Sequence, residues 1–137
     1  CSAAKPQKRW PADRFAAIAK VEMETGRKVA IVGTAADREV ADAVMNAAPG
    51  CVDLVGRTGL GELAALFRHA GAVMGNDTGP TFLAARVGTP TLMLMGADTD
   101  PSMSAPVGAR AGWLREDRIS EIASDDALAA LDRLRSG

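Results

Sequence analysis

The stretch GRTGLGELAALFRHAGAVMGNDTGPTFLAARVGTPTLMLMG at residues 56–96 decides the fold. It indicates helices at about 60–70 and 79–87. The first helix is followed by the short apolar run AVMG at 72–75, and the second by TLMLM at 91–95. Short apolar runs of this kind are typical of strands that are buried on both faces. Helix, strand, helix and strand with brief connections predict parallel strands joined by right-handed helical crossovers.

The same alternation continues on both sides of this stretch. Upstream, the apolar spacing and the breaker residues predict a helix over 10–26, a strand KVAIVG at 28–33, a helix over about 36–48 and a strand VDLV at 52–55. Downstream, residues 97–113 show little periodicity and hold two prolines, so we expect a loop there, followed by a helix over about 125–134. The prediction is an α/β, Rossmann-like fold with a parallel sheet and helices on both faces. In such sheets ligands bind at the carboxyl ends of the strands.

Length and composition support one globular domain over 1–137. The chain has 137 residues, is 47% hydrophobic and carries a formal charge of −1, so a basic nucleic-acid-binding face is not expected. Cys1 and Cys51 form neither a CxxC pair nor a disulfide framework, and no apolar run is long enough to span a bilayer. These features predict a soluble, cytoplasmic protein. Because the chain begins at Cys1 without an initiator Met, we treat it as a fragment of a longer protein.

The loop GNDTGP at 75–80 is the strongest candidate for a ligand site. Asp77 or Thr78 is placed to cap the following helix, Pro80 is an early helical residue, and Gly79 allows a ligand to approach the backbone. Free backbone N–H groups and the positive dipole end at such a helix start favour a phosphate. An ordinary capped helix with no ligand has the same chemistry, so both interpretations stay open here.

Three further loops are candidates at the same edge of the predicted sheet. The first is CSAAKPQKRWP at 1–11, whose Lys5, Lys8 and Arg9 can reach a pyrophosphate or simply be solvated. In the second, Gly33 is followed by Asp37, a carboxylate placed either to bind ribose hydroxyls or to begin a helix. The third is GRTGLGEL at 56–63, in which Thr58 lines a base pocket or caps a helix.

Several familiar signatures are missing. The sequence contains no GxGxxG, no GxxxxGK[ST] and no GxSxG, which argues against dinucleotide oxidoreductases, P-loop NTPases and α/β-hydrolases. His69 is the only histidine, so a histidine-based metal site has little material, and a helix-surface role is the better interpretation. Trp10 is expected in the core.

Taken together, KRWP at 8–11, KVAIVG at 28–33, the 56–96 stretch and TDP at 99–101 resemble the C-terminal domain of the ADP-heptose:lipopolysaccharide heptosyltransferases, glycosyltransferase family 9. The resemblance implies a two-lobed glycosyltransferase B architecture, of which this chain is the donor-binding lobe. The other lobe, absent here, would bind the lipopolysaccharide core acceptor. The implied activity is inverting transfer of a heptose or related sugar from an ADP-sugar. It needs no metal and no cofactor, and peripheral membrane association of the full protein is left open.

The resemblance also implies roles for individual residues. Lys8 matches the lysine that contacts the donor diphosphate, and Asp37 lies near the acidic residue that contacts the ribose, with Glu39 as a rival. Thr58 falls at the edge of the adenine pocket, and Asp77 matches the aspartate at the sugar.

Phosphate binding and catalysis complete the implied site. Thr78 and Gly79 offer backbone N–H groups to the phosphates, and the 78–80 backbone with Lys8 offsets the charge of the leaving ADP. No catalytic base is assigned in this chain, because the family base is a carboxylate on the absent lobe. Phe82 stands where many members have a histidine, which leaves the donor's identity open. The alternatives are a domain of a sugar-nucleotide epimerase-like enzyme and a non-catalytic nucleotide-binding module.

Overall fold

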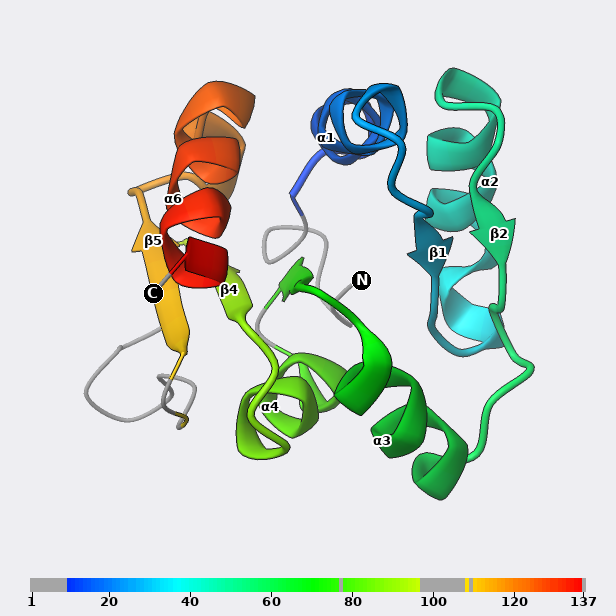
Figure 1. Cartoon of the computed structure of the whole chain (residues 1–137). Helices are drawn as coiled ribbons and strands as arrows, with labels where there is room; N and C mark the ends of the chain where they lie inside the picture. The colour runs from blue at the N-terminus through cyan, green and yellow to red at the C-terminus, as the bar shows by residue number, and fades with distance from the viewer. Residues whose placement is uncertain (1–9, 77, 97–107, 109, 137) are drawn as a thin grey trace.

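The computed structural model describes residues 10–76, 78–96, 108 and 110–136. Helices and strands alternate along these residues, as Figure 1 shows. In chain order they are α1 (Ala12–Glu24), β1 (Ala30–Ile31), the 3-10 turn η2 (Ala35–Asp37), α2 (Arg38–Ala47), β2 (Val52–Asp53), α3 (Leu60–His69), β3 (Val73–Asn76), α4 (Gly79–Arg86), β4 (Thr91–Met95), β5 (Ala111–Arg115), the 3-10 turn η3 (Ile119–Glu121) and α6 (Ser124–Ser136).

The strands form two separate parallel sheets. β1 pairs with β2, whereas β3, β4 and β5 form a three-stranded sheet with β4 in the centre. All five residues of β4 are buried, since the strand has neighbours on both edges and helices over both faces. β4 is therefore the most enclosed strand among the described residues.

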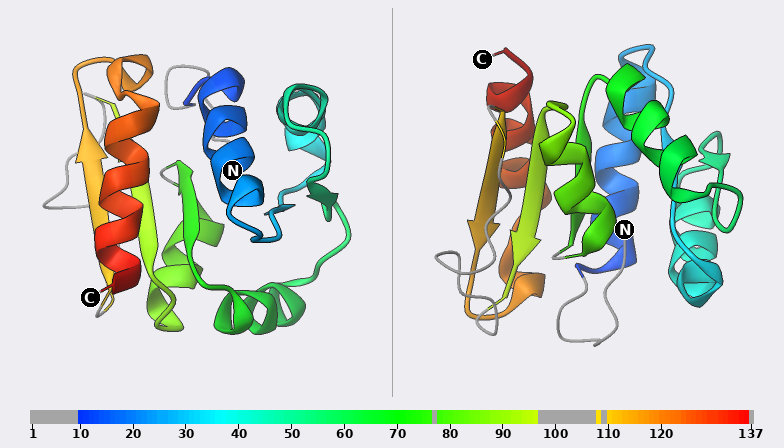
Figure 2. Two further views of the ribbon diagram at one scale, coloured as in Figure 1. Left: turned by 45° about the horizontal axis from the view of Figure 1, so that its top comes forward. Right: turned by 90° about the horizontal axis from the view of Figure 1, so that it is seen from below.

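Helices cover both faces of the sheets. α1 and α6 lie side by side on one face, and α3 and α4 lie on the other (Figures 1 and 2). Because successive side chains of a strand point to opposite faces, Leu92 and Leu94 of β4 join the core under α1 and α6. A smaller cluster of Leu63, Phe67 and Ala84 packs between α3 and α4.

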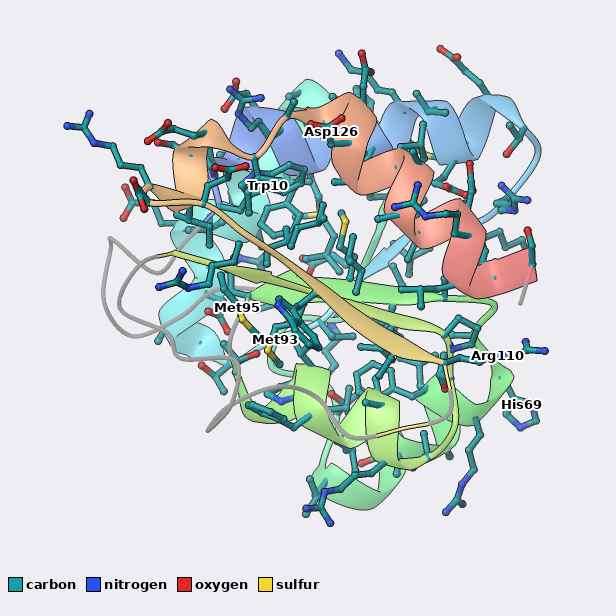
Figure 3. The ribbon with its side chains drawn as sticks, turned by 90° about the vertical axis from the view of Figure 1, so that its left-hand side faces the viewer. Trp10, His69, Met93, Met95, Arg110 and Asp126 are labelled. Atoms are coloured by element: carbon teal, nitrogen blue, oxygen red, sulfur yellow. The ribbon has the colours of Figure 1, made fainter. Side chains whose placement is uncertain are left out.

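Trp10 anchors the start of α1 in the core, as the sequence predicts. Its side chain is 1% exposed, and its indole Nε1–H donates to the Ile122 carbonyl at 3.0 Å. The Phe15 ring meets it edge-on, with ring centroids 4.9 Å apart. Figure 3 shows Trp10 inside the molecule beneath α6. The indole thus satisfies its polar group and fixes α1 against the segment that leads into α6.

The α/β class with parallel strands and helices on both faces is confirmed, and two expectations about its details are wrong. The loop expected over 97–113 ends early, because β5 begins at Ala111. This strand lies at the sheet's edge and keeps Trp113 46% exposed, so it lacks the continuous apolar run of a buried strand. The strand expected at 28–33 is regular only over Ala30–Ile31, although its hydrogen bonds to the neighbouring segment continue as far as Gly33, which accepts the Gly56 N–H at 2.8 Å.

Candidate functional site

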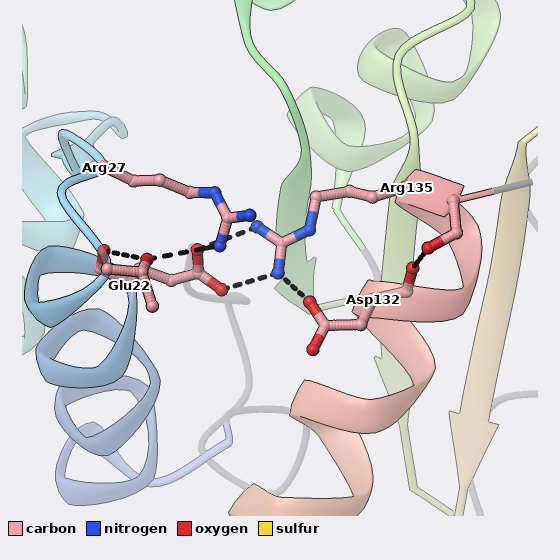
Figure 4. A network of polar contacts seen from close by, with 6 residues as sticks. Glu22, Arg27, Asp132 and Arg135 are labelled. Carbon is pink, nitrogen blue, oxygen red and sulfur yellow. Dashed lines mark hydrogen bonds and ion pairs between the residues drawn. The ribbon is translucent and has the colours of Figure 1, made fainter.

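The contacts of α1 place the described candidate loops, those after β1, β2 and β3, at one edge of the molecule. Trp10, at the start of α1, contacts Ile122, which precedes α6. At the other end of the helices, Glu22 of α1 is bonded to Arg135 of α6 at 2.7 and 2.8 Å (Figure 4). α1 and α6 therefore run in the same direction. Because α6 returns from the carboxyl end of β5, α1 also runs away from that edge, and β1 runs back toward it.

The loop after β1 is held by the carboxylate of Asp37. Asp37 Oδ2 accepts a hydrogen bond from the Thr34 backbone N–H at 2.8 Å, and the Thr34 hydroxyl lies 3.5 Å from the same oxygen. A Cβ on Gly33 would lie 2.4 Å from Asp37 Oδ2, so the glycine leaves the room that this carboxylate occupies. Asp37 therefore caps the first turn, and its second oxygen is the one left to bind a ligand.

The loop after β2 carries Thr58 to the same edge. Glu62 Oε1 accepts the Gly59 N–H at 3.1 Å and caps α3, a task that the sequence left open for Thr58. Among the described residues the Thr58 hydroxyl has no hydrogen-bond partner, and the side chain is half-buried. Thr58 is thus available to a ligand.

An ion pair between Asp53 and Arg38 lies next to these two loops. Asp53 of β2 accepts the Val55 N–H at 3.0 Å and pairs with Arg38 of α2 at 2.9 Å. The hydrogen bond from Arg38, with that from the Val55 backbone, lowers the pKa of Asp53 below its ordinary value. The carboxylate is therefore charged at neutral pH and joins α2 to the start of the Thr58 loop.

The start of α4 is the third part of the site. Thr78 occupies the N-cap position but makes no side-chain capping hydrogen bond, and Gly79 and Pro80 are the first helical residues. The Thr78 hydroxyl lies 3.2 Å from that of Thr81. A Cβ built at Gly79 meets no described atom within 4 Å, so the described residues leave room beside this glycine. Pro80 has no N–H, which leaves the amides of its neighbours as the donors at this helix start.

Asn76 is a site-forming residue that the sequence argument did not single out. Its side chain is fully buried at the end of β3, and its Oδ1 accepts the Trp10 N–H at 2.9 Å. This bond joins the segment entering α1 to the loop entering α4. The signal in the sequence is an amide at the end of an apolar run, because a buried amide needs a partner. Lys8, shortly before Trp10, and Asp77, directly after Asn76, lie outside the described residues. TDP at 99–101 lies outside them as well.

His69 lies away from this edge, and Phe82 has no polar group to offer a ligand. His69 is exposed at the end of α3, and Figure 3 shows it on the outer surface. Phe82 is half-buried in α4. Within the described ranges, no three His, Cys, Asp or Glu side chains are grouped to hold a metal ion.

The structure thus places at one edge a carboxylate-bearing turn at Gly33–Asp37, a hydroxyl without a described partner at Thr58 and the helix start at Thr78–Pro80. Backbone donors, a hydroxyl and a carboxylate at the carboxyl ends of parallel strands form the kind of edge that binds nucleotides in Rossmann-like folds. The fold and this edge define a Rossmann-like α/β lobe with a candidate ligand-binding edge.

The comparisons with known proteins give the family. The model of glycosyltransferase family 9 (heptosyltransferase) matches residues 1–129. The chain belongs to this family. It is 35% identical over 115 residues to lipooligosaccharide heptosyltransferase 2 of Haemophilus influenzae, covering 80% of this chain and 33% of that protein.

Two solved structures share the fold. The glycosyl transferase family 9 protein from Veillonella parvula superposes with a TM-score of 0.91 at 26% identity, over 98% of this chain and 44% of that one. The E. coli ADP-heptose lps heptosyltransferase II superposes with a TM-score of 0.89 at 24% identity, over 99% of this chain and 44% of that one. This coverage accords with one half, the C-terminal one, of a two-lobed enzyme.

The chain spans about one third of the length of the curated relative that it matches. In the part of the chain that the structure describes, no helix is long and apolar enough to cross a membrane.

Proposed function

We propose that this chain is the donor-binding lobe of a cytoplasmic glycosyltransferase that transfers a heptose, or a related sugar, from an ADP-sugar to a lipopolysaccharide core acceptor. The observation that carries the proposal is the convergence of three loops, at Gly33–Asp37, Thr58 and Thr78–Pro80, on one edge of a family 9 domain. The names of the matched relatives supply the sugar, the donor and the acceptor class. Residues 1–137 form this one lobe, and the acceptor lobe belongs to the rest of the protein.

The donor fits this edge in one orientation. The described residues leave room beside Gly79, and the N–H groups and dipole of this helix start would hold the diphosphate. Asp37, whose Oδ2 is already bonded to Thr34, would accept a ribose hydroxyl through its other oxygen. The partnerless hydroxyl of Thr58 would then meet the base. Lys8 and Asp77, by the family resemblance, would contact the diphosphate and the sugar.

The reaction would proceed with inversion and without a metal. The acceptor hydroxyl attacks the anomeric carbon from the face opposite ADP, and the glycosidic bond forms as the bond to the phosphate oxygen breaks. The hydroxyl proton passes to a carboxylate on the acceptor lobe, so this chain supplies no base. Its contribution is electrostatic, because preorganised N–H groups and Lys8 stabilise the charge that develops on ADP.

Calorimetric titration of the full-length protein with ADP, UDP and an ADP-sugar tests the donor assignment. We expect adenine nucleotides to bind and UDP to bind much more weakly. Lys8→Ala and Asp77→Ala should weaken binding of the ADP-sugar by roughly 10- to 100-fold, the loss expected for one charge-assisted contact. Lys20→Ala, an exposed lysine of α1, is the matched control and should leave the affinity unchanged.

Other outcomes would contradict the proposal. A preference for UDP would favour an epimerase-like enzyme or a different transferase. Absence of any nucleotide affinity in the folded full-length protein would mean that this lobe holds no donor site. If both variants bind as tightly as the parent, the site residues are misassigned even though the family stands.

A further inference from the structure

The side chain of Thr81, in the first turn of α4, lies in a slot between this helix and β3. Thr81 is 2% exposed, and its hydroxyl oxygen lies 3.2 Å from that of Thr78. A Cβ at Gly75 of β3 would lie 2.5 Å from Thr81 Oγ1, so the glycine leaves the room that this hydroxyl occupies. Among the described residues, Thr78 is the one hydrogen-bond partner of the Thr81 hydroxyl.

Burial sets the direction of the bond between the two hydroxyls. A buried hydroxyl hydrogen needs an acceptor, and in the described structure the acceptor within reach of Thr81 is Thr78 Oγ1. Thr78 is only half-buried, and Gly79 beside it is exposed. The Thr81 hydroxyl therefore donates to Thr78 Oγ1, which leaves the hydroxyl hydrogen of Thr78 to be donated to another group.

The same bond keeps Thr78 from capping its own helix. An N-cap threonine usually accepts the N–H of the second or third helical residue. The second residue of α4 is Pro80, which has no N–H, and the third is Thr81, whose N–H the Thr78 side chain does not accept. In the described structure the amides of Gly79 and Thr81 have no acceptor. The start of α4 thus keeps its donors while the Thr78 side chain is held by Thr81.

We propose that Thr81 is a positioning residue of the donor site. Its buried hydroxyl orients that of Thr78, so that the Thr78 O–H donates to an oxygen of the donor's diphosphate. The inference rests on the proposed function, since it needs the diphosphate to bind at the start of α4. A charged phosphate oxygen is a strong acceptor, and a donor that is already oriented loses less freedom when the ligand binds. Thr81 acts through Thr78, because its own side chain is enclosed.

Calorimetric titration of the full-length protein with ADP, comparing the parent with Thr81→Val, tests the inference. Valine has nearly the shape of threonine but no hydroxyl, so Thr78 becomes free to turn back and accept the N–H of residue 81. We expect Thr81→Val to bind ADP roughly 10-fold more weakly, the loss for one hydrogen bond to a charged group. Thr81→Ser keeps the hydroxyl and should restore most of the affinity.

Thr89→Val is the matched control. Thr89 lies beyond the other end of α4, is 4% exposed, and its hydroxyl donates to the Phe67 carbonyl. Its loss should lower the unfolding temperature but leave the affinity for ADP unchanged. The control therefore separates a loss of stability from a loss of orientation in the site.

A double-mutant cycle with Thr78→Ala separates positioning from packing. Once the Thr78 hydroxyl is absent, Thr81→Val should not weaken ADP binding further, because the group that it orients is gone. Equal affinities of the parent and Thr81→Val, or losses that add fully in the double variant, would overturn the inference and leave the proposed function standing. A folded parent that binds no ADP would overturn the proposed function, and this inference with it.

Discussion

The strands of both sheets, β3 to β5 and β1 with β2, lie among helices along the chain. Their side chains are buried to very different extents. β4 is buried along its whole length, from Thr91 to Met95. β1 and β2 pair over two residues each, and Ala30 and Val52 are exposed. The difference teaches that a neighbour on each edge and helices over both faces enclose a strand completely, whereas β1 and β2, which pair only with each other, stay partly open to solvent.

The candidate site draws on both sheets. The helix start at Thr78–Pro80 follows β3, in the enclosed sheet, whereas Asp37 and Thr58 follow the short strands β1 and β2. The diphosphate end of the proposed donor would therefore lie on the more rigid part. The ribose and base would meet loops whose position depends on a two-stranded sheet.

The largest expected contrast comes from truncating one core side chain in each sheet. Leu94→Ala should lower the free energy of unfolding by about 3 to 5 kcal/mol, because its side chain is 0% exposed and its neighbours cannot close the cavity. Ile31→Ala should cost less, about 2 to 3 kcal/mol, because Ile31, although only 5% exposed, lines a space of about 710 Å³ on one side and loses fewer packing contacts. Urea unfolding followed by circular dichroism measures both. Equal losses would mean that the two sheets are equally well packed.

Gly75→Ala should come next, with a loss of about 2 to 3 kcal/mol. A Cβ at this position in β3 would lie 2.5 Å from Oγ1 of Thr81, whose side chain is buried. A double-mutant cycle checks the cause. In a Thr81→Ala background the same substitution should cost much less, because the clashing atom is gone. An unchanged cost in that background would place the strain in the backbone instead.

Removing the ion pair between Glu22 of α1 and Arg135 of α6 should have a smaller effect, and one that depends on pH. Arg135→Met should lower the free energy of unfolding by about 1 to 2 kcal/mol at pH 7, because Arg135 is 15% exposed and holds the buried Glu22. Arg27→Met is the matched control and should cost less, since Arg27 is 53% exposed and pairs with the same carboxylate.

The sign of the pH dependence follows from Glu22. Its hydrogen bond from Arg135 lowers the pKa of the folded carboxyl below 4.5. The stabilisation is therefore fully present above pH 4.5 and is lost as the pH falls through the lowered pKa. The difference between the parent and Arg135→Met should shrink in that acidic range. A difference that stays constant down to pH 2 would show that the effect of the substitution is packing alone.

The enclosed sheet is also the part that the sequence predicts best. TLMLM matches β4 residue for residue, because a strand buried on both faces is a continuous apolar run. KVAIVG is also an apolar run, but its regular strand is only Ala30–Ile31, and no local pattern reveals where the regular part ends. β5 escapes prediction because Gly112 and the exposed Trp113 interrupt any periodicity.

For the site, local chemistry predicts where the loops lie but not how their atoms are used. The capping pattern at Thr78 and Pro80 follows from residue types alone. That Asp37 Oδ2 is already bonded to Thr34, or that Asn76 holds Trp10, depends on contacts that only the folded chain creates. The assignments of Lys8, Gly33, Asp37, Thr58, Asp77, Thr78, Gly79 and Pro80 to a donor remain predictions.

Asp53→Asn should have the smallest effect of the four. Asp53 lies in the short sheet, and its pair with Arg38 is partly exposed, so water and salt screen most of the attraction. Asparagine keeps an oxygen that can accept the Val55 N–H, which leaves the turn before Thr58 intact. Unfolding at low and high salt should show a slight loss that disappears at high salt, with Asp42→Asn as the matched control on the same arginine. A large loss of unfolding free energy that salt does not change would mean that the two-stranded sheet depends on this ion pair. Packing would then stabilise its two short strands even less than their burial indicates.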